Sequence, residues 1–518
     1  MAKQHTLDLN PEFLHALEVM EQPETHCLIT GRAGTGKSTL LEYFRAQTKI
    51  QVAVLAPTGV AAVNIRGQTI HSFFRFRPNV TVESAAKTAN RLRKRNKEEG
   101  VYEKLDAILI DEISMVRADL LDCVDVFLRT ARHKKNIPFG GVKMIFIGDL
   151  YQLPPVVRST ERKIFTEHYA SVYFFDAHVY SQINMTMVEL EKVYRQKDKE
   201  FIRLLNAVRN NSLTAEDVHL FNRRCQPHFD PKDELVVTLT ATNDQARQIN
   251  AAKLASLKTK LRRYCGEVSG DFSGETLPTD ETLELKEGSQ VMLLNNDPFG
   301  RWVNGTMAAV TRLKQESVVV RLESGGEEEI EPFTWNLFRY GYDSKKRALI
   351  TSSVGSFTQY PLRLAWAVTI HKSQGKTFDR AIVDVGRGTF ATGQMYVALS
   401  RCRTLEGMIL KTKLLPRHVL VDYRIIKFLT GHQYDVSEKK MPLEKKIAAI
   451  EEAIEMSGAL EIVYLKARDE KSKRVIRPME VGDMEYNGKI FLGIKAFCES
   501  RKEERVFRVD RILELKPI

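Results

Sequence analysis

The sequence predicts an α/β protein with two parallel-sheet lobes and a small β-rich domain at its C-terminal end. Short apolar runs alternate with helix-like segments from Cys27 to about residue 411, which is typical of parallel sheets covered by helices on both faces. Residues 31–38 resemble a phosphate-binding loop between a strand and a helix. Beyond Gly458 the pattern changes to strand-like alternation. A chain of 518 residues is also too long for a single core.

The first lobe is expected at residues 1–188. Its sheet should contain the apolar runs 26–30, 51–55, 107–110 and 142–147. A polar, basic insert at about 75–104 contains the run Arg91–Arg95. This run is either the solvated face of a helix or a nucleic-acid contact, and the sequence leaves both open.

Residues Gly31–Ser38 fit the pattern G-x-x-x-x-G-K-[ST]. Such a loop exposes backbone N–H groups at a helix start, where they bind phosphate. Lys37 would reach the β- and γ-phosphates of a nucleoside triphosphate, and the Ser38 hydroxyl would ligate Mg²⁺. The loop residues expected around the phosphates are Gly31, Gly34, Thr35, Gly36, Lys37, Ser38 and Thr39.

Polar residues follow two further strands at the edge where a nucleotide binds. Asp111 and Glu112 close the run 107–110. Asp111 would hold Mg²⁺, directly or through water, and Glu112 would polarise the attacking water. Gln152, after the run 142–147, would sense the γ-phosphate or the water; the alternative is a polar turn stiffened by two prolines.

Arg195 and Arg401 are the candidates for reaching the nucleotide from the second lobe. A planar guanidinium stabilises charge on the transferring phosphoryl group. In a chain with so many arginines either one alone could be a surface residue, but Arg401 ends a helix whose apolar face should be buried.

The second lobe is expected at residues 189–430. Its elements should be a strand at 236–240, a helix from Asn243, a strand at 381–385, a helix at 393–403 and a strand at 408–411. Between them, at about 285–345, short apolar runs are separated by Asn304-Gly305 and Gly325-Gly326. This spacing predicts a small β-barrel inserted in the second lobe.

The C-terminal part is expected to start with a linker and a helix at 431–457. Residues 431–442 are polar and indicate the linker. Pro442 suits a helix start, an apolar stripe follows at Leu443, Ile447, Ile450 and Ile454, and Gly458 should end the helix. Residues 458–518 form the predicted β-rich domain.

Two loop regions near the sheet edges combine small residues, hydroxyls and aromatic rings. Hydroxyl groups can bind phosphates and aromatic rings can stack on bases. The residues expected to contact a nucleic-acid strand are Thr58, Gly59, His71, Phe73, Thr369, His371 and Lys372. For both histidines, a partly buried structural role is the alternative.

Seven segments occur in order: GRAGTGKST, APTGVAAVNIRGQTIHSFF, LIDEISMV, GDLYQLPPV, LEKVYRQ, WAVTIHKSQGKTFD and YVALSRCRT. This set resembles the Pif-type DNA helicases, which belong to the 5′-to-3′ branch of helicase superfamily one together with RecD. The resemblance covers about residues 8–430.

The resemblance implies two RecA-like lobes that bind ATP and Mg²⁺ in the cleft between them. It places Lys37, Ser38, Asp111, Glu112, Gln152, Arg195 and Arg401 at the family's motor residues and adds Gly375 to the nucleotide site. It also implies movement on single-stranded DNA and at DNA junctions, with a role in repair, recombination or replication. Family members often carry an adenine-reading Gln near the segment Asn10–Phe13, which is absent here, so strict preference for ATP over GTP is not implied.

The C-terminal segments Ile462-Val463-Tyr464, Ile490-Phe491-Leu492 and Arg505–Ile512 are similar to a WYL domain. WYL domains are associated with nucleic acid or another regulatory ligand, so Arg477, Arg505, Arg508 and Arg511 are candidate DNA contacts. The alternative is a small sheet domain whose arginines only form surface pairs.

Composition bounds the cellular setting and the partners. The formal charge of +12 favours a polyanionic partner once it is joined to a motor site. No apolar stretch approaches a membrane span, and the six scattered cysteines favour reduced thiols. We therefore expect a cytoplasmic monomer that acts away from membranes. Two other functions stay open: an RNA-directed translocase, and a nucleotide-gated nucleic-acid-binding protein.

Overall fold

The computed structural model describes residues 9–95, 100–157, 161, 165, 167–231, 234–272, 277–343, 345–386, 388–389, 391–466, 469–486 and 488–518. The chain forms two compact units. The first comprises Met1–Arg209 and Leu213–Leu420, and the second Asn210–Ser212 and Val421–Ile518. Among the described residues, no helix combines the length and the apolar character needed to cross a membrane.

A six-stranded parallel sheet forms the first lobe, with strand order β3-β2-β4-β5-β1-β6. Its strands are β1 (His26–Gly31), β2 (Val52–Ala56), β3 (Gln68–Thr69), β4 (Ala107–Ile110), β5 (Lys143–Gly148) and β6 (Met185–Leu190). The four predicted strands are present. The predicted lobe boundary after residue 188 is wrong, because β6 runs through it and pairs with β1.

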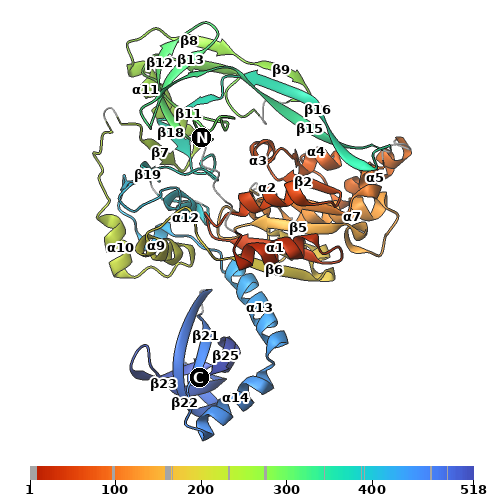
Figure 1. Ribbon diagram of the computed structural model, residues 1–518, viewed down its shortest axis with the longest axis vertical. Helices are drawn as coiled ribbons and strands as arrows, with labels where there is room; N and C mark the ends of the chain where they lie inside the picture. Colours follow the sequence, from red (N-terminus) through yellow and green to blue (C-terminus); the bar gives the residue numbers. More distant parts are fainter. Residues whose placement is uncertain are drawn as a thin grey trace. The chain divides into compact units, whose positions relative to one another are not determined.

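Helices cover both faces of this sheet (Figure 1). They are α1 (Pro11–Glu21), α2 (Lys37–Gln47), α3 (Gly59–Asn64), α4 (Ile70–Phe74), α5 (Val82–Arg95), α6 (Val101–Lys104) and α7 (Ala118–Ala131). Leu40, Leu41 and Phe44 of α2 are buried in the core that Ile29 of β1 and Leu109 of β4 share. This burial fixes the helix start beside the carboxyl ends of the strands, where the phosphate loop lies.

The basic insert is helical. Ala85 and Ala89 of α5 are fully buried, α5 packs on α7, and the Arg93 guanidinium hydrogen-bonds the ring of His133. Arg91 is exposed on the outer face. The part of the insert at residues 96–99 lies outside the described residues.

The second lobe has a four-stranded parallel sheet of order β18-β7-β19-β20. Its elements are α9 (Lys199–Arg209), α10 (Ala215–Asn222), β7 (Val237–Thr240), α11 (Asn243–Ser256), β18 (Ala367–Thr369), β19 (Ala381–Asp384), α12 (Gln394–Leu399) and β20 (Met408–Leu410). The predicted helix 393–403 is shorter than expected. Cys402 forms a parallel bridge with Phe378, which turns the chain out of the helix after Ser400.

The insert of the second lobe is larger than the predicted range 285–345. Its strands are β8 (Arg262–Cys265), β9 (Glu267–Gly270), β10 (Thr282–Leu285), β11 (Gln290–Leu293), β12 (Met307–Leu313), β13 (Val318–Leu322), β14 (Glu327–Ile330), β15 (Phe333–Asp343), β16 (Ala348–Gln359) and β17 (Leu362–Leu364). One apolar core joins Tyr264, Leu293 and Leu362, so the insert extends over 262–364.

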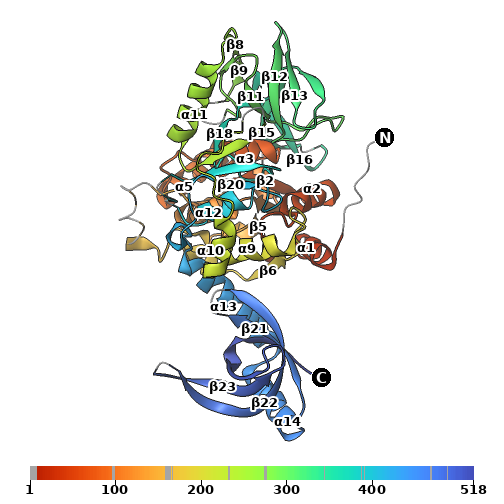
Figure 2. The same ribbon diagram turned by 90° about the vertical axis from the view of Figure 1, so that its left-hand side faces the viewer.

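The long hairpin of β15 and β16 runs from this insert to the first lobe (Figures 1 and 2). The Tyr340 hydroxyl accepts a hydrogen bond from Val54 N at 2.9 Å, and Tyr340 N donates to Gln68 Oε1 at 3.2 Å. Gln51 Oε1 accepts from Leu349 N at 2.6 Å. The hairpin is therefore fastened to the edge of the first sheet.

The second unit joins two helices to a five-stranded antiparallel sheet of order β24-β23-β22-β21-β25 (Figure 2). Its elements are α13 (Tyr423–Lys440), α14 (Leu443–Glu455), β21 (Leu460–Lys466), β22 (Glu470–Tyr486), β23 (Lys489–Cys498), β24 (Glu503–Arg508) and β25 (Ile512–Pro517). Its core includes Ile450, Ile462, Ile494 and Ile512.

The predicted linker at 431–442 is wrong for most of its length, since residues 431–440 are the second half of α13. Polar contacts hold this half in place. Ser437 is buried, its hydroxyl donates to the carbonyl of Leu513 at 2.7 Å, and the Lys446 ammonium donates to Ser437 Oγ at 2.8 Å. An apolar pattern cannot reveal a helix anchored in this way.

Candidate active site

A cavity of about 510 Å³ lies at the phosphate loop, where residues from both lobes meet. It is lined by Phe13, Ala33, Gly34, Thr35, Gly36, Lys37, Ser38, Thr39, Glu112, Gln152, Tyr194, Arg195, Gly375 and Arg401. Most of the predicted nucleotide-site residues are thus brought together. Gly31 lies directly beneath the loop at the end of β1.

The loop has the backbone that a phosphate cradle needs. Gly34 and Gly36 have φ of 83° and 88°, which side-chain-bearing residues rarely adopt. A Cβ on Gly34 would also lie 2.5 Å from Cβ of Arg195. The buried Lys37 ammonium donates to the carbonyls of Gly31 and Arg32 at 2.7 and 2.9 Å. Burial lowers the pKa of Lys37, while the nearby carboxylates oppose that shift.

Asp111 and Glu112 follow β4 directly. Glu112 has φ 51°, a left-handed conformation, and its N–H donates to Asp111 Oδ1 at 2.9 Å. Burial, and then the charge of Asp111, raise the pKa of Glu112 to about 7, and burial raises that of Asp111. The Ser38 hydroxyl and these carboxylates are hard oxygen ligands of the kind that Mg²⁺ prefers. The donor set thus fits the predicted metal.

Gln374 connects the two lobes at the reacting end of the cavity. Its amide donates to Glu112 Oε2 at 2.9 Å and to Gln152 Oε1 at 3.0 Å. The Gln152 amide donates to Asp149 Oδ2 at 3.1 Å, and Arg209 lies 3.8 Å from the other oxygen of Asp149. Sequence reasoning missed Gln374 and Asp149, although both lie in quoted motifs. Nothing in the sequence indicated Arg209.

Two arginines complete the cavity from the second-lobe side. Arg401 is 1% exposed, and its guanidinium donates to the carbonyls of Val397 and Lys376 at 2.8 and 3.1 Å. Arg195 donates to the carbonyl of Ser400 at 3.2 Å. Burial, and then the charge of Arg195, lower the pKa of Arg401 to about 9. Among the described residues, neither guanidinium pairs with a carboxylate, so both are available to an anion.

At the end of the cavity where a base would bind, the side chain of Phe13 has no amide group that could hydrogen-bond the base. Phe13 is 3% exposed and its ring packs edge-on against Tyr43. Asn10 is near, but its amide donates to the Tyr194 hydroxyl at 2.9 Å and its Oδ1 accepts from Phe13 N. No hydrogen bond to adenine can come from the Phe13 side chain.

The predicted strand-contact residues lie in two places. Thr58 and Gly59 start α3, where Thr58 Oγ1 accepts from Ala61 N, and the half-buried His71 lies in α4. Thr369 and Lys372 line a second cavity, beside the half-buried His371. Phe73 is 4% exposed within a cluster of Phe74, Tyr102 and Tyr340, so its ring is not presented to a base.

Comparison with known proteins agrees with this geometry. Residues 12–219 match the model of the PIF1-like helicases. The chain is 33% identical over 439 residues to the ATP-dependent DNA helicase Pif1 of Bdellovibrio bacteriovorus, covering 82% of this chain and 92% of that one. This chain belongs to the PIF1-like helicase family. It is therefore an ATP-hydrolysing helicase.

Solved structures of this family share the fold. Pif1 from Bacteroides sp. in complex with ADP-AlF4 is 34% identical, with a TM-score of 0.75 over 83% of this chain and 98% of that one. Bacteroides Pif1 bound to ssDNA is also 34% identical, with a TM-score of 0.59 over the same shares. The predicted two-lobed PIF1-like fold is thereby confirmed.

Residues 445–517 match the WYL domain. Three of its four candidate arginines form surface ion pairs: Arg477 with Glu499 at 2.7 Å, Arg505 with Glu503 at 2.5 Å, and Arg508 with Asp510 at 2.6 Å. Such pairs are weak, but they cancel much of the local positive charge. This arrangement favours the alternative in which the arginines serve the surface of a small sheet domain.

Proposed function

We propose that this PIF1-like ATP-dependent DNA helicase tracks on single-stranded DNA in the 5′-to-3′ direction and couples each ATP hydrolysed to a change of lobe closure. The observation that carries the proposal is the composition of the cavity. The phosphate loop and Glu112 come from the first lobe, while Gly375 and Arg401 come from the second. Nucleotide binding would therefore draw the lobes together.

Each residue of the cavity has a separate part in ATP hydrolysis. Lys37 leaves its carbonyl partners and holds the β- and γ-phosphates, with the loop amides around Gly34 and Gly36. Glu112 orients the attacking water and takes its proton, and Gln152 hydrogen-bonds the water or the γ-phosphate. Arg195 and Arg401 stabilise the charge that develops on the transferred phosphoryl group.

Magnesium would be held by Ser38 and Asp111. When bound, Mg²⁺ neutralises charge on the phosphate oxygens. The two carboxyl groups have raised pKa values because they are buried together. A cation at Asp111 would favour its ionised form and leave Glu112 as the group that accepts a proton.

Gln374 supplies the coupling between hydrolysis and the strand. It bonds Glu112 and Gln152, and it belongs to the same turn as Thr369, His371 and Lys372. Loss of the γ-phosphate would free Gln152 and alter this turn. We place the strand across Thr58, Gly59 and His71 in the first lobe and Thr369, His371 and Lys372 in the second. Bacteroides Pif1, which shares this fold, has been solved bound to ssDNA, and this supports the binding of a single strand.

The domain organisation and the cellular setting are further parts of the proposal. We propose a motor that ends near Leu420, followed by a WYL-type module with its own core, and a cytoplasmic monomer that works on junctions during repair, recombination or replication. We also propose relaxed discrimination between ATP and GTP, because the Phe13 side chain has no group that could hydrogen-bond the base.

An unwinding assay tests the proposal. Fluorescent duplexes with a 5′ or a 3′ single-stranded tail are mixed with protein and ATP, with Lys37→Ala as the inactive control. We expect unwinding only with the 5′ tail, and ATPase stimulation by single-stranded DNA rather than by RNA of the same sequence. Preference for the 3′ tail, or stronger stimulation by RNA, would contradict it.

A further inference from the structure

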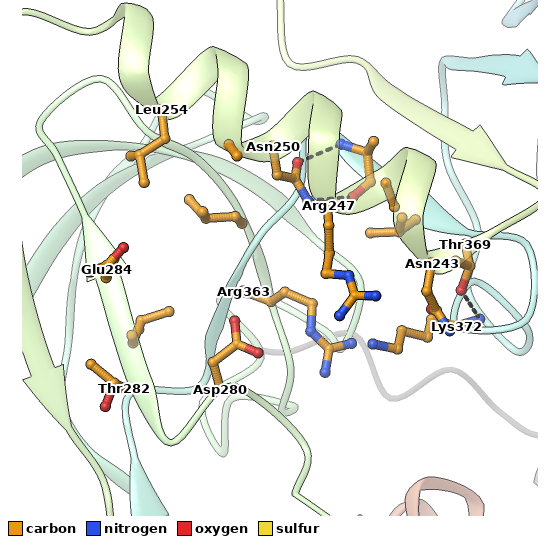
Figure 3. A pocket seen from close by; sticks show the side chains of 16 residues that line it. Asn243, Arg247, Asn250, Leu254, Asp280, Thr282, Glu284, Arg363, Thr369 and Lys372 are labelled. Carbon is orange, nitrogen blue, oxygen red and sulfur yellow. Dashed lines mark hydrogen bonds between the residues drawn. The ribbon is translucent and has the colours of Figure 1, made fainter.

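A second cavity, of about 660 Å³, lies between α11, the strand β10 and the turn after β18. Figure 3 shows that its two ends differ in chemistry. Arg247, Arg363 and Lys372 point toward one another at one end. Leu254 lies at the other end with Thr282 and Glu284, whose carboxylate pairs with Arg263, and Leu283 and Leu364 also line the cavity. Its size lies in the range of ordinary ligand sites.

The basic end holds more positive charge than its neighbours cancel. Arg363 is half-buried and its guanidinium donates to the carbonyl of Pro278. Desolvation, then Arg363, lower the pKa of Lys372, and Arg247 adds to the effect. Desolvation also lowers the pKa of Arg363. The charge of Asp280 opposes the shift at both residues. Asp280, and Asp244 in its ion pair with Arg247, set two carboxylates against these three cations, so one positive charge is left that an anion would neutralise.

The partners of these cations fit a binding role better than a structural one. Arg247 is 78% exposed and its ion pair with Asp244, one turn earlier on α11, holds it at the mouth. No hydrogen bond from the Lys372 ammonium occurs within the described ranges. By contrast Asn250, on the same helix, is fully used, since it exchanges two hydrogen bonds of 2.8 Å with Ala367. Asn250 is thus satisfied, whereas the Lys372 ammonium is open to a ligand, with Arg247 held beside it by Asp244 and Arg363 by the Pro278 carbonyl.

We propose that this cavity holds one nucleotide of the tracked strand, with its phosphodiester on Arg247, Arg363 and Lys372 and its nucleoside against Leu254 and Leu364. The proposal rests on the proposed function, because Thr369 and Lys372 belong to the segment placed along the strand. It adds Arg247 and Arg363 as strand-holding residues and makes the second lobe a grip for a single unstacked nucleotide.

The test compares Arg247→Gln, Arg363→Gln and the double variant with Arg223→Gln. Arg223 is an exposed arginine at the end of α10, outside this cavity, so its removal costs the same charge as either single variant and half that of the double variant. Binding of a labelled thymidine oligonucleotide is followed by fluorescence anisotropy over a range of NaCl concentrations. We expect the double variant to bind about tenfold more weakly, as for a lost charged hydrogen bond. The slope of log affinity against log salt should fall by about 0.7 for each lost phosphate contact.

A second measurement addresses the nucleoside. A single 2-aminopurine, whose fluorescence rises when it unstacks, is moved along the oligonucleotide. One position should brighten with the wild-type protein and with Arg223→Gln, and stay dim with the double variant. Free thymidine monophosphate should not displace the strand at concentrations that saturate a nucleotide pocket.

The outcomes separate the possibilities. Equal affinity and slope for the double variant and Arg223→Gln would overturn the site, while 5′-tail unwinding by the wild-type protein would leave the motor intact. A reduced salt slope without any position of raised 2-aminopurine fluorescence would overturn the placement of the nucleoside. Displacement of the strand by free thymidine monophosphate would assign the cavity to a free nucleotide. If Arg363→Gln does not fold, the exposed Arg247→Gln decides, with a smaller reduction in affinity expected.

Discussion

Arg401 places a positive charge at a position that its surroundings almost completely bury. Its guanidinium is held by the carbonyls of Val397 and Lys376, which fix its position without neutralising it. A buried cation of this kind acts most strongly when negative charge grows in front of it, as on the γ-phosphate during hydrolysis. The same reasoning applies to Arg195, held by the carbonyl of Ser400.

We therefore expect Arg401→Ala and Arg195→Ala each to lower ATP turnover about a thousandfold, while nucleotide affinity changes little. Steady-state ATPase rates with saturating single-stranded DNA, together with titration of a fluorescent nucleotide, measure the two effects. A variant with weak binding and a normal maximal rate would contradict this role.

His26 is a second residue whose environment fixes its protonation. Its Nδ1 accepts a hydrogen bond from Met144 N at 3.0 Å, so the imidazole must be neutral at that nitrogen. Burial, and then the charge of Lys143, lower the pKa of His26 to about 4. The unfolded chain, with a pKa near 6.5, binds the proton more readily, so stability is present above pH 6.5 and is lost as pH falls toward 4.

In His26→Asn the Asn Oδ1 can replace Nδ1 as acceptor without titrating. We expect the free energy of unfolding of the wild type to fall by about 2 kcal/mol more than that of the variant between pH 7 and pH 5. Differential scanning calorimetry at several pH values measures this as a steeper fall of the wild-type melting temperature. Parallel curves for both proteins would show that His26 does not titrate on unfolding.

At the scale of elements, the hairpin of β15 and β16 fastens the insert to the first lobe through few polar contacts. Tyr340 provides the central one, with Val54 N, and its ring packs on Phe73. Removing the hydroxyl leaves a buried N–H without its partner, which costs about 1–3 kcal/mol.

Tyr340→Phe should therefore loosen the hairpin from the first lobe, and Tyr342→Phe is the matched control. Tyr342 is two residues away on the same strand, and its ring receives the Lys104 ammonium on its face. We expect Tyr340→Phe alone to increase amide hydrogen exchange in β2 and to reduce base pairs unwound per ATP. Equal exchange in both variants would remove the hairpin from the coupling.

Elements defined by their own residues were predictable, and those defined by distant partners were not. The strand 107–110 and the start of α11 at Asn243 coincide with prediction, because β4 is uniformly apolar and Thr242 caps the helix. The end of α12 depends on the distant bridge to Phe378, and the second half of α13 on buried Ser437. At the active site, motif residues were predictable, but Arg209 reaches Asp149 only through the fold.

At the scale of the whole molecule, the charge is unevenly shared. In residues 421–518 the basic and acidic residues nearly balance, so almost all of the formal charge of +12 belongs to the motor. Electrostatic attraction to DNA should follow this distribution. The paired arginines of the WYL-type module agree with it.

A chain that ends after Leu420 should consequently remain a folded motor whose ATPase is stimulated by single-stranded DNA, with an unchanged salt dependence of binding. Residues 421–518 hold a separate apolar core and should fold by themselves. Anisotropy titrations of the full chain and the truncation, together with circular dichroism of the isolated module, test this. A large fall in DNA affinity on truncation would restore the DNA-holding role of the module.

The hairpin also restricts how the two lobes can move. The segment 191–198 joins the lobes covalently. At another place the hairpin joins them through its hydrogen bond with β2. Two points of attachment define an axis, so opening reduces to rotation about one line instead of free translation. The register shift between Leu337 and Phe338 lies partway along the hairpin and provides the natural place for it to flex. Each catalytic cycle would then swing the insert through an arc whose radius is set by the length of the hairpin, as long as the Tyr340 contact holds its end.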